Sequence, residues 1–217
     1  MPTSLPPEAV QELRDNLVPE EVFRALEMAL PIIERVCGRA GMDFDEEEGD
    51  DANLFGQQCS RRGRNLIARE VEAIKPTNIT VERPRNTLYV QAGPTRIYFW
   101  AAGDDAGSPR LRGGKTKPEI LDHCVRQLEL WQEARTGPPA YLVVAYRATP
   151  SSRRLEKVVV GLPKDVDQWD FAATIYDRPV DKPAKTRKPM PSERFDRAQP
   201  PAPVIQLKSH RDKKSEK

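Results

Sequence analysis

Arginine and lysine side chains gather at three places in the middle of the sequence, and such side chains are the usual protein contacts to phosphate. One group lies on a predicted helix, one lies in the loop from 103 to 117, and one lies beside the predicted hairpin connection between two strands. They bind a polyanion only if they converge on one surface; otherwise they form a solvated, charge-balanced surface. The residues predicted to contact nucleic acid are Arg61, Arg62, Arg64, Arg112, Lys115, Arg153 and Arg154.

The segment Gly113–Thr116 resembles the end of a phosphate-binding P-loop, but the rest of that loop is missing. The loop needs a glycine five residues before its second glycine, so that backbone amides can surround the phosphates. This sequence has Pro109 there, which carries no amide hydrogen. Nor does a G-x-S-x-G motif occur. We therefore predict no ATPase site and no catalytic residue, and we favour a function that is not enzymatic.

Two patterns that suggest metal binding also fail. The acidic run 43–51 would need glycine and glutamate at the sixth and twelfth positions of an EF-hand loop, where Glu48 and Leu54 stand. The three cysteines lack the C-x-x-C spacing that zinc sites favour. We therefore predict a solvated acidic linker, no metal site and no cofactor.

Aromatic side chains next to a cation mark one predicted strand. Tyr98 and Trp100 share a face of this strand with Arg96. Such a face can stack unpaired bases, or it can be core covered by a helix. We favour the core interpretation.

Hydrophobic periodicity and turn residues predict an α/β protein with a single mixed sheet of about five strands flanked by helices. Pro31 is expected to kink or divide the first helix. The segment 169–175 is either a final strand or a packing segment. The other predicted elements are helices at 20–36, 53–74 and 118–132, and strands at 79–82, 87–91, 96–102, 141–146 and 156–162.

Over residues 53–162 this order resembles the restriction-endonuclease-like core, in which a helix, an antiparallel meander, a second helix and a further strand form one sheet. That family places an acid on the second meander strand and Glu-x-Lys or Asp-x-Lys on the third, to hold Mg²⁺ and position water. Here these strands read TLYVQ and RIYFWAA, without acid or lysine. The resemblance thus implies a degenerate, non-cleaving member. The alternative is a rearranged nuclease site that uses Glu70, Glu82, Asp104 and Lys115.

Charge and composition divide the 217 residues into three zones. Residues 1–50 form an acidic helical segment and linker with 4 basic and 13 acidic side chains, a net of −9. Residues 52–178 are the expected α/β core domain. Residues 179–217 are basic and proline-rich, and we expect a disordered tail there. The acidic end then either meets a separate partner, shields a basic surface or improves solubility.

No apolar run approaches ~18 residues, so the sequence predicts no membrane span. The N-terminus lacks a basic start followed by an apolar stretch, so we expect no signal peptide. The cysteines are few and scattered, which favours the reducing cytoplasm. Our leading hypothesis is a non-catalytic binding or regulatory module that contacts nucleic acid or a nucleic-acid-processing complex. The first alternative is a divergent metal-dependent nuclease. The second is a protein-interaction adaptor that docks a partner through its acidic N-terminus and basic tail.

Overall fold

The secondary structure is that of a single mixed sheet with helices. The computed structural model describes residues 4–83, 88–102, 106–109, 111, 116–131, 136–149 and 154–178. In these ranges the helices are α1 (Pro7–Asp15), α2 (Glu20–Met42), α3 (Ala52–Ile74) and α4 (Thr116–Leu130). The strands are β1 (Ile79–Glu82), β2 (Tyr89–Ala92), β3 (Thr95–Ala101), β4 (Tyr141–Thr149), β5 (Arg154–Asp165) and β6 (Gln168–Asp177). The predicted α/β class with one sheet is confirmed, with six strands where about five were expected.

The sheet has the order β1-β2-β3-β4-β5-β6, and only the central pair β3 and β4 runs parallel among its described pairings. Parallel neighbours need a long crossover connection, which here contains α4. The segment 169–175, for which the sequence left two interpretations open, lies within strand β6, which pairs antiparallel with β5.

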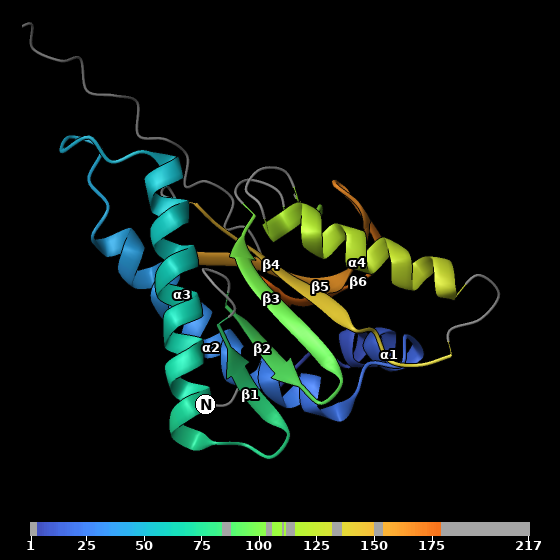
Figure 1. Cartoon of the computed structure of the whole chain (residues 1–217). Coiled ribbons are helices and arrows are strands. Elements are labelled where there is room, and N and C mark those ends of the chain that lie inside the picture. The colour runs from blue at the N-terminus through green and yellow to red at the C-terminus, as the bar shows by residue number, and fades with distance from the viewer. Residues whose placement is uncertain are drawn as a thin grey trace, which may run out of the picture. The chain divides into compact units, whose positions relative to one another are not determined.

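Helices cover both faces of the sheet, and α2 and α3 lie side by side on one of them (Figure 1). The Tyr146 hydroxyl of β4 donates to the Cys59 carbonyl of α3 at 3.2 Å. Its neighbour Ala145 faces the opposite way, because side chains alternate along a strand. Trp100 lies beside Ala145 on that opposite face, and Lys117 of α4 places its Nζ 5.4 Å from the Trp100 ring centroid. The helix pair and α4 therefore lie on opposite faces.

The N-terminal helices belong to the same compact unit as the sheet. A kink or a division was expected at Pro31, and the structure shows that α2 is not divided there. Apolar side chains before and after the proline share one buried face, and burial of each contributes about 1.5–3 kcal/mol, enough to offset a lost helical hydrogen bond. The expected division between 1–50 and 52–178 thus runs between two packed helices. The tail expected at 179–217 lies outside the described residues.

The three cysteines are buried free thiols. Cys37 of α2 and Cys59 of α3 meet where the helices pack. The hydrogen bond from the Cys37 thiol lowers the pKa of Cys59, and the same contact, together with burial, raises the pKa of Cys37. Burial also raises the pKa of Cys124 to about 12. The thiols are therefore part of the packed interior.

Thiol titration tests this packing. Because all three cysteines are at most 1% exposed, the native protein is expected to give almost no reaction with a thiol reagent at pH 8 within minutes. In guanidinium chloride the same sample should release three equivalents. Rapid reaction of one thiol before unfolding would place that cysteine at the surface and contradict the structure.

Candidate nucleic-acid interface

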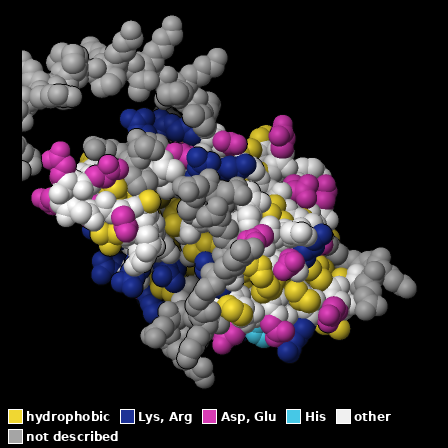
Figure 2. Space-filling model, turned by 90° about the horizontal axis from the view of Figure 1, so that it is seen from above, with side chains coloured by type: hydrophobic (Ala, Val, Ile, Leu, Met, Phe, Trp, Pro, Cys, Tyr) yellow, Lys and Arg dark blue, Asp and Glu magenta, His cyan; other side chains and the backbone are white. Residues whose placement is uncertain are grey.

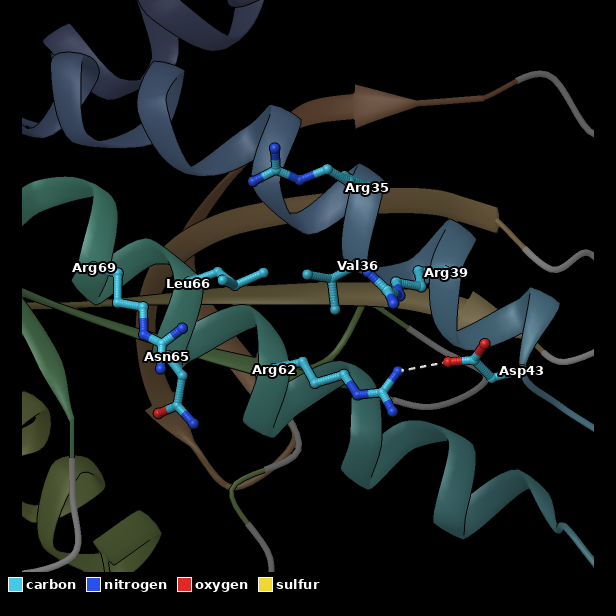
Figure 3. Close-up of a pocket in the computed structure, with 8 residues that line it drawn as sticks. All are labelled: Arg35, Val36, Arg39, Asp43, Arg62, Asn65, Leu66 and Arg69. Carbon is cyan, nitrogen blue, oxygen red and sulfur yellow. Dashed lines mark hydrogen bonds and ion pairs between the residues drawn. The ribbon is translucent and has the colours of Figure 1, made fainter. Parts of the chain in front are cut away.

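An open pocket of about 420 Å³ lies between α2 and α3 (Figure 3). Its lining contains two arginines from each helix, together with two apolar side chains, one amide and one carboxylate. The lining residues are Arg35, Val36, Arg39, Asp43, Arg62, Asn65, Leu66 and Arg69.

Helical spacing explains why these arginines meet. Arg35 and Arg39 are four residues apart on α2, and Arg62 and Arg69 are seven apart on α3. Both spacings return a side chain to the same helix face, since a turn takes 3.6 residues. All four side chains are exposed, and each helix buries its other face against the protein. Packing of α2 against α3 then brings the two basic faces to a common opening.

The floor of the pocket is apolar. Val36 is 3% exposed and Leu66 is half-buried, and both belong to or pack against the main hydrophobic cluster. Figure 3 shows these two side chains pointing toward each other between the helices, with arginines around them. The exposed amide of Asn65 stands on the same face of α3. The pocket thus combines an apolar floor with a cationic rim.

The rim carries an excess of positive charge. Arg62 forms an ion pair with Asp43, which follows the end of α2, at a distance of 2.9 Å. Arg35, Arg39 and Arg69 form no ion pair with a carboxylate in the described part of the chain. The pKa of the Glu72 carboxyl on α3 is lowered mainly by its hydrogen bond with Arg83, and the charge of Arg69 adds to this effect. Four positive charges therefore face one negative charge around the pocket.

The acidic segment after α2 borders this basic surface. At the left of Figure 2, where α2 ends and α3 begins, Asp and Glu side chains lie next to a group of Lys and Arg side chains. Both partners of the Asp43–Arg62 pair are about half exposed, so water screens the pair and its contribution to stability is small. An anion that carries more negative charge than one carboxylate can therefore displace Asp43 from Arg62.

The structure separates the arginines that were predicted together on α3. Arg62 lines the pocket, and Arg61 is exposed on the same helix but is not part of the lining. Arg64 is half-buried, and its Nε donates to the Ser60 carbonyl at 3.3 Å. Arg154 is exposed at the start of β5, opposite Thr149. The remaining predicted contacts, Arg112, Lys115 and Arg153, lie outside the described residues.

The prediction omits three of the four pocket arginines. Arg69 belongs to the sequence cluster on α3, and its spacing of seven from Arg62 is the signal that could have singled it out. Arg35 and Arg39 lie in an acidic segment, but their spacing of four on a helix with one apolar face indicates that both lie on one exposed face. Their proximity to α3 depends on how the helices pack.

Among the basic residues near the connection of β4 and β5, Arg147 does not extend this pocket. Arg147 is two residues from Ala145 on β4 and so belongs to the α4 face of the sheet. Its Nε lies 2.6 Å from Glu156 Oε2, and Glu156 Oε1 accepts a hydrogen bond from the Thr149 hydroxyl at 2.8 Å. This arginine is therefore largely neutralised within the sheet.

Two aromatic side chains of β3, Tyr98 and Trp100, are buried on the α4 face. Tyr98 and Trp100 are each 8% exposed. The Arg96 guanidinium lies 5.2 Å from the Tyr89 ring centroid and 5.6 Å from that of Tyr141, and it donates to the Tyr141 hydroxyl at 3.0 Å. Burial raises the pKa of Tyr98 well above its usual value. These rings pack against one another and offer little surface to a base.

The alternative nuclease site is only partly within the described residues. Glu70 is exposed on α3, and Glu82 accepts a hydrogen bond from the Tyr89 hydroxyl, which occupies one of its oxygens. Asp104 and Lys115 lie outside the described part of the chain. Within that part, no three side chains of histidine, cysteine, aspartate or glutamate group together as metal ligands.

Comparisons with known proteins do not add a family assignment. No protein-family model, no curated protein and no solved structure matches the chain. In the described ranges, every helix is too short or too polar to cross a bilayer. The arginine pocket is therefore the feature of this protein that points to a function.

Proposed function

We propose that this protein is a non-catalytic binding or regulatory module that contacts nucleic acid through the arginine pocket between α2 and α3. One observation carries the proposal: four arginines from two helices surround a single pocket, and a single carboxylate lies among them. Guanidinium groups bind phosphate oxygens through paired hydrogen bonds and remain charged at every physiological pH.

The helix pair favours binding because it holds the arginines in place. α2 and α3 are 23 residues long each and pack along their buried faces, so their backbones lose little freedom when an anion binds. The arginine side chains are exposed and need no uncovering. A cytoplasmic location belongs to this proposal, and the three free, buried thiols support a reducing compartment.

The test is binding of the full chain to single- and double-stranded DNA and RNA, measured by fluorescence anisotropy across a salt series. If arginines neutralise about three phosphates of a duplex, raising the salt from about 50 to 200 mM should lower the affinity about 40-fold. Added Mg²⁺ should produce no cleavage. Absence of binding at about 50 mM salt would overturn the proposal and direct the search to a protein partner.

A further inference from the structure

The dimensions of the pocket limit which part of a nucleic acid can enter it. Its volume of about 420 Å³ falls within the range of ~300–1,000 Å³ that is typical of small-molecule sites. An internal phosphate of a duplex has a sugar on each side and sits on the outside of a wide rod. Such a phosphate can touch the rim but cannot reach Val36 at the floor, whereas a single nucleotide or a strand end can.

The charge of the rim suits a terminal phosphate better than an internal one. An internal phosphodiester carries one negative charge, whereas a phosphomonoester carries about −1.5 to −2 at pH 7 and has three acceptor oxygens. Arg35 and Arg39 approach the pocket from α2, and Arg62 and Arg69 approach it from α3. This arrangement supplies more donors than one diester can accept.

The apolar floor calls for a ligand with an apolar body beside its phosphate. Val36 and Leu66 offer aliphatic surface on which a sugar or the face of a base can rest. Asn65 adds an amide that both donates and accepts, which is the pattern that pairs with base edges. A phosphoserine peptide has no planar group close to its phosphate with which to use these features.

From these three observations we infer that the pocket binds the phosphomonoester of a nucleoside, as it occurs at a 5′-phosphorylated strand end or in a free nucleotide. This inference rests on the proposed function and narrows it to one ligand chemistry. The phosphate lies among the four arginines and the nucleoside lies against Val36 and Leu66. When the phosphate binds, it replaces Asp43 as the ion-pair partner of Arg62.

The first experiment compares two single strands of about ten nucleotides, both labelled at the 3′ end, with a 5′-phosphate on one and a 5′-hydroxyl on the other. At about 150 mM salt the phosphorylated strand should bind about tenfold more tightly, the size of one charge-assisted contact. AMP should compete better than inorganic phosphate, because the floor adds to binding. Comparison of AMP with the phosphorylated strand then shows whether a free nucleotide or a strand end binds more tightly.

In this experiment, two outcomes overturn the inference but not the proposed function. Equal affinity for the two strands would mean that the protein binds nucleic acid without recognising the 5′-phosphate, which leaves the proposed function intact. A phosphoserine peptide that competes better than AMP would assign the pocket to a phosphopeptide. Failure to bind either strand even at about 50 mM salt would instead remove the proposed function itself.

Two pocket variants and one control variant test whether the effect arises in the pocket. Arg39→Gln should reduce the preference for the 5′-phosphate to about one, whereas Arg126→Gln, on the opposite face, should keep it. Asp43→Asn should tighten AMP binding about threefold, because it frees Arg62 from its ion pair. Unchanged or weaker AMP binding by Asp43→Asn would show that Arg62 does not hold the phosphate and would overturn the inference.

Discussion

Exchanging both Arg39 and Arg69 for glutamate is expected to weaken nucleic-acid binding at low salt about 100-fold or more. The double variant removes one cation from each helix of the pocket and places a carboxylate in each position. Each charge-assisted hydrogen bond contributes about 1.5–3 kcal/mol to binding. Loss of two such contacts should therefore raise the dissociation constant by more than about 100-fold. The measurement is the dissociation constant by fluorescence anisotropy at about 50 mM salt. Both side chains are exposed, so the thermal midpoint should change little.

A matched control separates the pocket from the overall charge of the protein. Arg126→Glu combined with Lys164→Glu changes the net charge by the same amount at exposed positions of α4 and β5. This control should weaken binding only a few-fold, and mainly at low salt, because charges beyond a Debye length are screened. Equal losses in the two double variants would mean that the net charge, and not the pocket, holds the nucleic acid.

Replacing Gly161 with alanine is expected to lower the free energy of unfolding by about 3 kcal/mol or more. A Cβ atom on Gly161 would lie 2.2 Å from the Phe171 carbonyl oxygen and 2.9 Å from the Ala172 Cα. These are backbone atoms of β6, and Gly161 is also paired with Val143 of β4 on its other side. The strand therefore cannot move aside without loss of hydrogen bonds. Urea unfolding followed by tryptophan fluorescence measures the change.

The control is the same substitution at a glycine with open space around it. Gly56 lies within α3, and no heavy atom would come within 4 Å of its added Cβ. Gly56→Ala should therefore raise the free energy of unfolding by about 0.5–1 kcal/mol, because alanine favours the helix. If Gly161→Ala unfolded at the same urea concentration as Gly56→Ala, the close packing of β5 against β6 would be contradicted.

Local sequence patterns were sufficient for most of the elements. α4 begins and ends two residues before its predicted bounds, and β4 begins at its predicted first residue and ends three residues later than predicted, because both patterns are set by neighbouring residues. The first helix was predicted to kink or divide at Pro31, where a local rule does apply. Tertiary burial on both sides of the proline keeps the two halves in one helix, and no local sequence pattern shows such burial.

The candidate site was predictable only in part. The arginine cluster on α3 stands out in the sequence, and Arg62 is the predicted member that lines the pocket. Arg64 belongs to the same cluster, yet it lies at the edge of the buried face, where it bonds to the backbone of its own helix. Which arginine of a helix faces a neighbour depends on the rotation of that helix, and packing determines the rotation.

The sequence by itself determined the α/β class, the positions of most helices and strands, and the presence of a basic cluster on α3, since composition and short-range periodicity encode these properties. Only the tertiary structure decided that α2 joins the core and that Arg35 and Arg39 lie across a pocket from Arg62 and Arg69. More than 20 residues separate the two pairs along the chain. The two pairs of arginines lie close together because both helices bury their apolar faces against the same sheet, which is a property of the whole fold.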